Sequence, residues 1–372
     1  MPKAVPTKRV YIPKPSGKKR PLGIPTIKDR VAQAMVKNTL EPEWESEFEA
    51  NSYGFRPGRS CHDAIQQCHN KLNRGVAGGH QWVLDADIKG FFDNIAHETI
   101  INLIGSVPSG ELIKGWLKAG FIDEGQYNPT ETGTPQGGVI SPLLANIGLH
   151  GLETYIKQIN SKLGIIRYAD DFIVTSKDKE SLEDVLIQIR QWLSQRGLEI
   201  SDEKTRIVHI DEGFNFLGFN LRQYNGKLLI KPRKEKVLAF CKKIGKTLSS
   251  MKANTQEEVI KKLNPLLRGF ANYYRGQVSK ETFSYINHRV WQYLWRWATR
   301  RHPNKGKRWV KDRYFQWHRG NKWTFMCQGT GRKGKAKTYI LYDISKTPIV
   351  RHIKVKGQAS PDDPALREYW HN

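Results

Sequence analysis

The feature that most constrains this chain is a set of acidic residues on segments that otherwise have the pattern of buried β-strands. Residues 82–88 form an apolar run interrupted only by two carboxylates, of which Asp87 is nearer the end. Residues 165–175 are two β-rich runs that meet at Asp170 and Asp171, which predicts a tight hairpin with acids at its tip. If these segments are neighbours in one antiparallel sheet, the three carboxylates converge at its edge.

Periodicity elsewhere predicts helices around this sheet. Residues 10–24 are extended and broken by Pro and Gly, which favours a strand-turn-strand unit, and helical spacing begins after them. Pro142 suits a first helical position, and apolar residues recur at helical spacing as far as Ile159, which predicts one long helix. Beyond Pro232 the chain changes to amphipathic helices rich in Lys and aromatic residues, so we expect a domain boundary near residue 230.

The charge balance indicates the class of partner. The 372 residues include 61 Lys and Arg against 36 Asp and Glu, a formal charge of +25 that suits a polyanion, so nucleic acid is the leading partner. A membrane surface is the alternative, but no apolar run approaches the roughly 18 residues of a spanning helix. The basic, Pro-rich start has no signal-peptide pattern, and neither the four Cys nor the eleven His have metal-ligand spacing. We therefore expect reduced thiols and a cytoplasmic location.

Carboxylates that converge at a sheet edge suit nucleotidyl transfer. This reaction needs two divalent ions, one to activate the attacking hydroxyl and one to hold the triphosphate, and Mg²⁺ prefers carboxylate oxygens. For a lone Asp-Asp pair, the alternative is a solvated turn. The surrounding motifs decide between these two interpretations.

Five segments together resemble a known family. They are Ser-Tyr-Gly-Phe-Arg-Pro-Gly-Arg-Ser at 52–60, Trp-Val-Leu-Asp-Ala-Asp-Ile-Lys-Gly-Phe-Phe-Asp at 82–93, Thr-Pro-Gln-Gly-Gly-Val-Ile-Ser-Pro-Leu at 134–143, Arg-Tyr-Ala-Asp-Asp at 167–171 and Phe-Asn-Phe-Leu-Gly-Phe at 214–219. In order and spacing they are similar to the consecutive polymerase motifs of group II intron reverse transcriptases, and the resemblance covers nearly the whole chain. It implies an α+β right-hand polymerase, with fingers and an antiparallel palm sheet over residues 1–230, a helical thumb or maturase domain over 231–320 and a basic DNA-binding-like region over 321–372.

The resemblance also implies roles for residues near the acids. It makes Asp87, Asp170 and Asp171 the catalytic residues and the ligands of two Mg²⁺ ions, with the carbonyl of Ile88 as a further ligand. Asp85 lies on the same strand face as Asp87 but is not in a ligand position, so it is a neighbour of the metal site or a solvated residue.

Six residues are expected at the incoming dNTP. Phe92 matches the aromatic position that excludes a 2′-hydroxyl, and Gln136 and Gly137 form the turn that borders the nucleotide. Lys14 and Arg20 would bracket the triphosphate, with solvated charge as the alternative, and Lys204 would lie near the leaving pyrophosphate. A separate grip on the primer end is expected at Phe216, Leu217 and Gly218, although such a strand is also good core material.

The C-terminal third resembles the maturase or thumb region. Helical spacing puts Val290, Leu294 and Trp297 on a core face, and six arginines are expected on exposed faces that bind RNA: Arg268, Arg275, Arg289, Arg296, Arg300 and Arg301. The alternative is a Trp-packed thumb with merely solvated charge. The Gly- and Lys-rich stretch 328–337 is expected to be a mobile loop.

Two departures from the family pattern bear on function. The finger motif begins almost at Met1, where family members carry several dozen residues more, and residues 1–372 contain no Cys- and His-bearing cluster like the endonuclease of many members. We therefore expect an RNA-directed DNA polymerase that uses an RNA template and a DNA primer or target, binds intron RNA to assist splicing and mobility, and does not cleave the second DNA strand. The alternatives are a maturase that has lost polymerase activity and a host-defence or CRISPR-associated reverse transcriptase.

Overall fold

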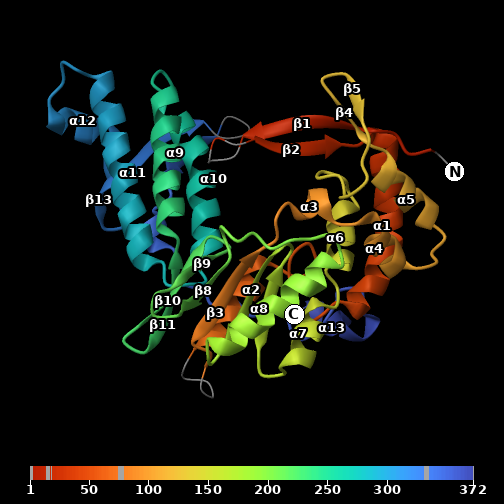
Figure 1. Ribbon diagram of the computed structural model, residues 1–372. Helices are drawn as coiled ribbons and strands as arrows, with labels where there is room; N and C mark the ends of the chain where they lie inside the picture. Colours follow the sequence, from red (N-terminus) through yellow and green to blue (C-terminus); the bar gives the residue numbers. More distant parts are fainter. Residues whose placement is uncertain (1–2, 14–16, 18, 74–78, 331–334, 372) are drawn as a thin grey trace. The chain divides into compact units, whose positions relative to one another are not determined.

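A computed structural model describes residues 3–13, 17, 19–73, 79–330 and 335–371. The chain divides into two compact units (Figure 1). Unit 1 comprises residues 1–214, 223–228 and 353–372, and unit 2 comprises residues 215–222 and 229–352.

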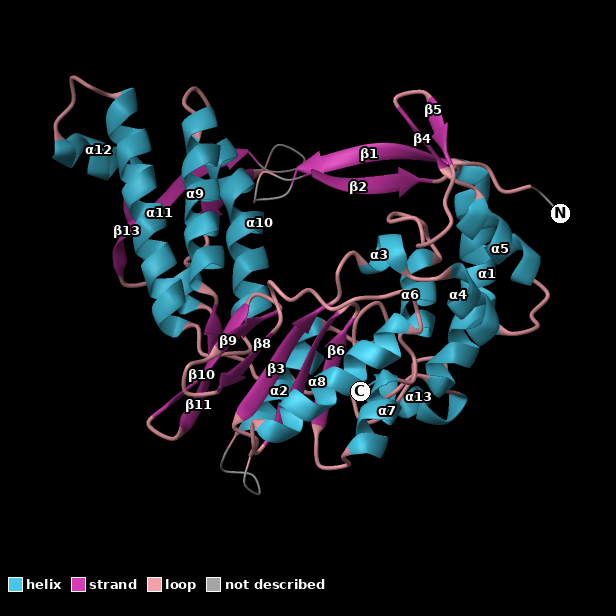
Figure 2. Ribbon diagram, viewed as in Figure 1, coloured by secondary structure: helices cyan, strands magenta, loops and turns pink. Residues whose placement is uncertain are grey.

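A four-stranded sheet forms the centre of unit 1. Its order is β6 (Gly164–Tyr168), β7 (Asp171–Ser176), β3 (Trp82–Asp87) and β8 (Arg206–His209), and every neighbouring pair is antiparallel (Figure 2). The predicted strand and hairpin are therefore confirmed, and they are neighbours as expected. Leu84 and Phe172 belong to a large core cluster, whereas Asp87 and Asp171 point to the opposite face because side chains alternate along a strand.

Helices supply the rest of that core. The residues that pack with Leu84 come chiefly from α1 (Ile27–Glu47), α4 (His97–Ile104), α5 (Gly110–Lys118), α6 (Ser141–Gly148), α7 (Leu152–Ile159) and α8 (Glu180–Ser194). Two further helices are α2 (Cys61–Leu72), which contacts β6, and the single turn α3 (Phe91–Asn94).

The single long helix expected from Pro142 to Ile159 is wrong. Two helices, α6 and α7, cover this stretch, and Gly151 between them has φ 92°. That left-handed conformation is cheap for Gly and interrupts helical hydrogen bonding, while the apolar residues on both sides remain buried in the same core.

A second sheet in unit 1 carries the predicted finger. β1 (Thr7–Pro13) and β2 (Lys19–Ile24) form the expected antiparallel hairpin, and β4 (Phe121–Asp123) and β5 (Gln126–Asn128) extend it in the order β2-β1-β4-β5. The α1 helix starts directly after β2, where the Thr26 hydroxyl accepts a hydrogen bond from the Asp29 backbone N–H.

Unit 2 is built on three long helices. α9 (Lys234–Ser250), α10 (Gln256–Tyr274) and α11 (Lys280–Arg301) run beside one another (Figure 1), and α11 buries Val290, Leu294 and Trp297 as predicted. A short helix, α12 (Lys307–Tyr314), precedes an antiparallel sheet of β12 (Phe315–His318), β13 (Asn321–Thr330) and β14 (Ala336–Ile340). The loop expected over 328–337 is in part the paired ends of β13 and β14, and 331–334 lie outside the described residues.

The remaining strands lie where the two units divide. They are β9 (Phe214–Phe216), β10 (Phe219–Tyr224) and β11 (Lys227–Pro232), which form one sheet in the order β11-β10-β9. The predicted boundary near residue 230 falls in β11, so the change of character along the sequence coincides with this sheet.

The end of the chain returns to unit 1. After η2 (Ile344–Lys346), residues 353–372 carry η3 (Pro364–Leu366) and α13 (Arg367–His371). The Arg59 guanidinium donates to the carbonyl of Gly357 at 2.9 Å, and the Val355 N–H donates to Asp63 at 2.8 Å. The segment predicted as one DNA-binding-like region, 321–372, is therefore shared between the two units.

The predicted α+β class is confirmed by this mixture of antiparallel sheets and helices. None of the helices among the described residues has the length and apolar character needed to cross a membrane.

Candidate active site

Asp87 and Asp171 occupy directly opposed positions on β3 and β7. In an antiparallel pair, opposed residues project from the same face with Cβ atoms about 4.5–5.5 Å apart. Asp170 precedes β7 in the turn from β6, where Ala169 has φ 57° and bends the chain tightly enough to place two carboxylates at the tip. The structure thus brings the three predicted catalytic acids together.

The electrostatics of these acids show their mutual repulsion. Desolvation, followed by the charges of Asp170, Asp87 and Asp85, raises the pKa of Asp171 to about 6. Desolvation and the charge of Asp87 also raise the pKa of Asp170, against the backbone N–H and the cationic Arg20 and Lys204. Of these causes, the repulsion among the carboxylates is the one that a bound cation would relieve.

Two basic residues contact the acids: Lys204, which precedes β8, and Arg206, the first residue of β8. The Lys204 ammonium lies 2.7 Å from an Asp87 carboxylate oxygen, which raises the pKa of Lys204. The Arg206 guanidinium lies 3.4 Å from Asp85, so Asp85 is an ion-pair partner of β8. The Ser201 N–H donates to the Asp87 carbonyl at 2.8 Å and holds this segment against the end of β3.

The donor set fits a hard divalent cation in its chemistry. Three carboxylates share one sheet edge, and two of them have raised pKa values that added positive charge would lower. The three carboxylates are neighbours, but neither they nor any other acidic, His or Cys side chains among the described residues already have the arrangement of a metal-binding group. The Lys204 ammonium is the cation that contacts Asp87 in this arrangement. Ile88, the proposed carbonyl ligand, is buried in a bridge opposite Ile200.

Arg167 supports the turn that carries Asp170 from inside unit 1. Its buried guanidinium donates to the Ala169 carbonyl at 3.3 Å and to Asn146 Oδ1 at 3.2 Å. The Asn146 carboxamide in turn donates to the Gly54 carbonyl at 2.8 Å, and the Tyr53 N–H donates to the Arg167 carbonyl at 2.9 Å. Burial lowers the pKa of Arg167 to about 10, so it stays cationic at neutral pH.

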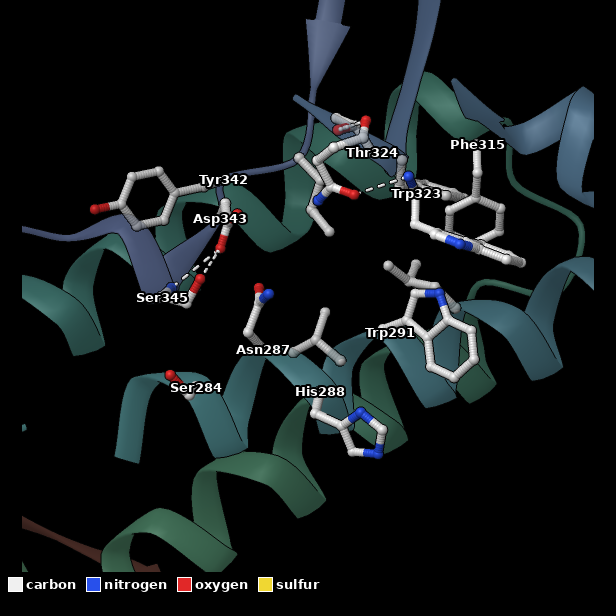
Figure 3. A pocket seen from close by; sticks show the side chains of 15 residues that line it. Ser284, Asn287, His288, Trp291, Phe315, Trp323, Thr324, Tyr342, Asp343 and Ser345 are labelled. Atoms are coloured by element: carbon white, nitrogen blue, oxygen red, sulfur yellow. Dashed lines mark hydrogen bonds between the residues drawn. The ribbon is translucent and has the colours of Figure 1, made fainter. Parts of the chain in front are cut away.

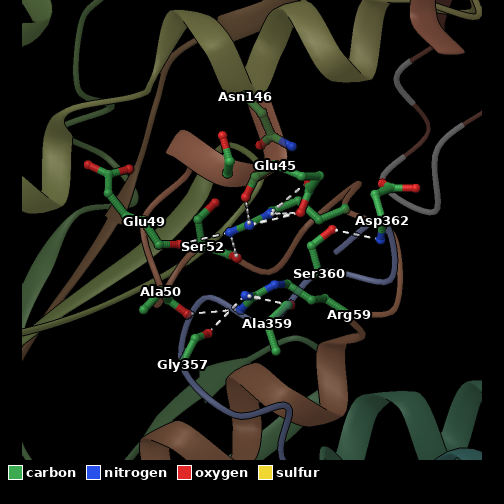
Figure 4. A network of polar contacts seen from close by, with 12 residues as sticks. Glu45, Glu49, Ala50, Ser52, Arg59, Asn146, Gly357, Ala359, Ser360 and Asp362 are labelled. Carbon is green, nitrogen blue, oxygen red and sulfur yellow. Dashed lines mark hydrogen bonds and ion pairs between the residues drawn. The ribbon is translucent and has the colours of Figure 1, made fainter. Parts of the chain in front are cut away.

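A second buried guanidinium holds the segment that packs against this turn. Arg56 forms an ion pair with Glu45 at 2.9 Å and donates to the carbonyls of Glu49 and Ser52 at 2.8 and 3.0 Å. Arg59, in the same network, donates to the carbonyls of Ala50 at 3.0 Å and Gly357 at 2.9 Å (Figure 4). Buried charges with this many hydrogen bonds fix the segment in one conformation.

Arg56, Arg59 and Arg167 belong to the motifs at 52–60 and 167–171, but no role was predicted for them from the sequence. The signal was present, because Arg167 is a lone charge within the otherwise apolar strand β6, and a charge in such a strand requires buried partners. Asn146 had no such signal, since its partners are remote in sequence.

Phe92, Gln136 and Gly137 meet the finger sheet. Phe92 is half-buried and lines a cavity of about 400 Å³ together with Gln136 and the strands β1 and β2. The Gly23 N–H donates to the Gln136 carbonyl at 2.7 Å, and a Cβ on Gly137 (φ 118°) would lie 2.9 Å from the Gly23 carbonyl. Gly at 137 is therefore required for this close approach of turn and finger.

The other predicted nucleotide contacts have different outcomes. Arg20 is exposed on β2. Its positive charge lowers the pKa of Asp170, so Arg20 acts on the acidic edge through its charge. Lys14 lies outside the described residues.

The predicted primer grip is a tight turn within unit 2. Leu217 and Gly218 have φ values of 48° and 83°, and Phe216 is buried. The hydroxyls of Tyr273 and Tyr274 on α10 donate to the carbonyls of Leu217 and Gly218 at 2.8 and 3.2 Å. This turn is thus anchored to the helices that follow it.

The expectation that six arginines are exposed is correct for only half of them. Arg268, Arg296 and Arg300 are exposed, whereas Arg275, Arg289 and Arg301 are half-buried. Arg301 lies over the Trp297 ring at 4.7 Å and donates to the carbonyls of residues 252 and 254, so part of its role is structural.

Three of these arginines border a groove between α9 and α11. The groove has a volume of about 530 Å³, and Tyr293 and Trp297 contribute its aromatic surface. The cations that line it are Lys242, Lys246, Lys252, Arg296, Arg300 and Arg301, and no acidic side chain is among its lining residues. Such a cationic groove with aromatic rings suits a phosphate backbone.

Comparison with known proteins agrees with the geometry. Residues 12–221 match the family model for reverse transcriptase (RNA-dependent DNA polymerase), and residues 237–315 match that for the group II intron maturase-specific domain. The group II intron-encoded protein LtrA of Lactococcus lactis subsp. cremoris is 33% identical, over 72% of this chain and 60% of its own length. Protein YkfC of Escherichia coli K12 is 35% identical, over 58% of this chain and 67% of its own. Apo telomerase from Candida tropicalis aligns with a TM-score of 0.49 at 13% identity, over 78% of this chain and 61% of that chain.

Proposed function

This chain belongs to the reverse transcriptase family and carries a group II intron maturase-specific domain, and from that membership we propose that it copies RNA into DNA. The substrates are dNTPs, an RNA template and a DNA primer end. The observation that carries the proposal is the direct opposition of Asp87 and Asp171, beside Asp170, at one sheet edge. The match to the maturase-specific domain favours the group II intron class over a host-defence enzyme.

Members of this family use divalent metal ions, and we propose that Asp87, Asp170 and Asp171 hold two Mg²⁺, which lower the pKa of the attacking hydroxyl and neutralise the triphosphate. The Lys204 ammonium then leaves Asp87 and is free to contact a phosphate oxygen. Arg20 adds a guanidinium on the finger side, and the Phe92 ring limits the space beside the sugar.

Primer extension tests the catalytic proposal. Asp170→Asn keeps the shape of the side chain and removes its charge, so metal-dependent extension of a DNA primer on an RNA template should fall about 10²- to 10³-fold, the range for one lost transition-state contact. Asp184→Asn, at an exposed position on α8, is the matched control and should extend normally. Equal extension by the two variants would refute the assignment of the acidic edge.

We also propose that unit 2 binds intron RNA through the groove between α9 and α11. The support is the set of six cations that line it without an acid, within the segment that matches the maturase-specific domain. The competing function is that of a protein that only assists splicing. It predicts that the unmodified chain extends no primer under any condition, and that Asp170→Asn leaves splicing intact. Bacterial relatives support a cytoplasmic location, and we propose that the protein is associated there with the nucleoid or with a ribonucleoprotein.

Two adjacent lysines on α9 provide a sharp test of RNA binding. Lys242 lines the groove, whereas Lys243 is equally exposed but lies outside it. Each phosphate contact contributes roughly 0.7–0.9 to the slope of log K against log salt. Lys242→Gln should therefore reduce that slope by about one contact on a structured intron RNA, and Lys243→Gln should not. Identical slopes for both variants would place the RNA elsewhere.

A further inference from the structure

A second cavity in unit 2 lies apart from the cationic groove and has a different chemistry. Its volume is about 500 Å³, and it is bordered by α11, by the strands β12 and β13, and by residues 341–345. The rings of Trp291, Phe315 and Trp323 gather on one side, and Ser284, Tyr342, Asp343 and Ser345 lie on the other, with Asn287 between them (Figure 3).

The aromatic side is held rigidly. The Trp323 indole makes edge-to-face contacts with Trp291, Trp295 and Phe315, each with ring centroids 5.7 Å apart. Trp323 is nevertheless 42% exposed. A large aromatic ring that is fixed in orientation and left partly in water offers a stacking surface at little cost in side-chain entropy.

The polar side favours an uncharged ligand with hydrogen-bonding edges. The Asp343 carboxylate accepts hydrogen bonds from the Ser345 N–H at 3.1 Å and the Ser345 hydroxyl at 2.5 Å, which fixes its position. It is the one acidic residue in the lining, and no Lys or Arg is among the residues that line the cavity. A phosphate would be repelled here, whereas a carboxylate and the Asn287 carboxamide suit the amino and carbonyl groups on the edge of a nucleobase.

Positive charge lies at the polar side of the cavity. The exposed Lys280 ammonium donates to the carbonyl of the lining residue Ser345 at 3.2 Å, and the exposed Lys346 follows Ser345 along the chain. These cations are available to the phosphates that flank a base, while the cavity itself takes the base.

We propose that this cavity binds one unstacked nucleobase of a single-stranded or looped RNA segment. The proposal rests on the RNA binding proposed above and adds a base-selective contact to it. The base stacks on the Trp323 face and presents its hydrogen-bonding edge to Asn287 and Asp343.

Binding of two RNA probes to the full chain tests the pocket. The probes are a 12-nucleotide oligo(rA) strand and a 12-base-pair RNA duplex of mixed sequence. Loss of one stacked base corresponds to roughly 5- to 150-fold in affinity. Trp323→Ala should weaken oligo(rA) binding by a factor in this range and change duplex binding less than about twofold, because paired bases do not enter the cavity. Trp317→Ala, at another exposed tryptophan of the same sheet outside the lining, is the matched control.

A second variant and a crosslink distinguish the loss of a base contact from misfolding of Trp323→Ala. Asn287→Ala removes a polar group without removing a ring and should also weaken oligo(rA) selectively. An oligomer with one 5-iodouridine should crosslink to Trp323 or Trp291. Unaltered oligo(rA) binding in both variants, with crosslinks elsewhere, would overturn the pocket while leaving the polymerase proposal in place. Absence of RNA binding by the unmodified chain would instead overturn the RNA-binding proposal itself.

Discussion

The buried Arg167 guanidinium donates a hydrogen bond of 3.3 Å to the carbonyl of Ala169, the residue directly before Asp170. A charge on β6 thus fixes the backbone of the turn that presents the acids, without reaching their carboxylates. Arg167 is therefore a positioning residue in the proposed reaction.

Arg167→Lys keeps the charge but removes the guanidinium nitrogen that donates to both Ala169 and Asn146, because the lysine side chain ends in an ammonium of different shape and reach. We expect the free energy of unfolding to fall by about 1–3 kcal/mol, because a buried carbonyl and carboxamide lose their donor. The kcat for primer extension should fall while KM for dNTPs changes little, since the nucleotide contacts remain. Urea denaturation and steady-state extension measure both. A loss of stability with unchanged kcat in the folded fraction would show that Arg167 stabilises the fold and does not position the acids.

Phe92→Val tests the predicted selection against ribonucleotides. The half-buried ring packs edge-on against Phe55 and Phe91 and lines the cavity that Gln136 also borders. Removing the ring should raise incorporation of ribonucleotides relative to deoxynucleotides by up to about 10²-fold, the range that a hydroxyl clash supplies in a hydrophobic pocket. Competitive single-nucleotide extension measures the ratio. Tyr127→Ala, exposed on β5 outside the cavity, should leave it unchanged.

The elements of the acidic edge could be predicted from the sequence because their patterns are local: carboxylates in an apolar strand, and a hairpin with acids at its tip. The pairing of these elements was a condition of the prediction, and the structure supplies it by opposing Asp87 and Asp171. The motif resemblance supplied the roles that spacing alone left open.

The contacts that could not be predicted depend on packing between remote segments. The helical spacing of apolar residues continues across Gly151, so only the backbone conformation there shows the break between α6 and α7. Arg59 binds the carbonyl of Gly357, almost 300 residues later, and no local pattern encodes that pairing. Arg301 is half-buried because its guanidinium lies over Trp297, a contact that depends on side-chain packing.

Lys204→Met tests whether the ammonium and a metal ion compete for Asp87. The Nζ lies 2.7 Å from the carboxylate, so an ion at this edge must displace it. Without the ammonium, Mg²⁺ and Mn²⁺ should bind the nucleotide-free protein several-fold more tightly by calorimetry, since the uncompensated carboxylates repel one another more strongly. Extension should nevertheless slow, because the cation that would face the pyrophosphate is lost. Metal affinity equal to that of the unmodified chain would show that the ion pair does not compete.

His80 should make the stability of unit 1 depend on pH. Desolvation, followed by the charges of Lys71, Lys157 and Lys177, lowers the pKa of His80 to about 4, and its Nδ1 lies 2.7 Å from the Thr175 hydroxyl. The unfolded chain takes up this proton near pH 6.5, so stability is complete above that pH and is lost as the pH falls from about 6.5 towards 4.

His80→Gln removes this titration and should flatten the profile over that window. The difference between the two slopes should stay below the ceiling of about 1.4 kcal/mol per pH unit for one proton, because the side chain is partly exposed. Urea unfolding between pH 7.5 and 4.5 measures it, and carboxylates that titrate in both proteins cancel in the comparison. His371→Gln, at an exposed histidine of unit 1, should follow the unmodified chain. If His80→Gln follows it as well, the imidazole is protonated in the folded state, and the lysines around it do not exclude the proton.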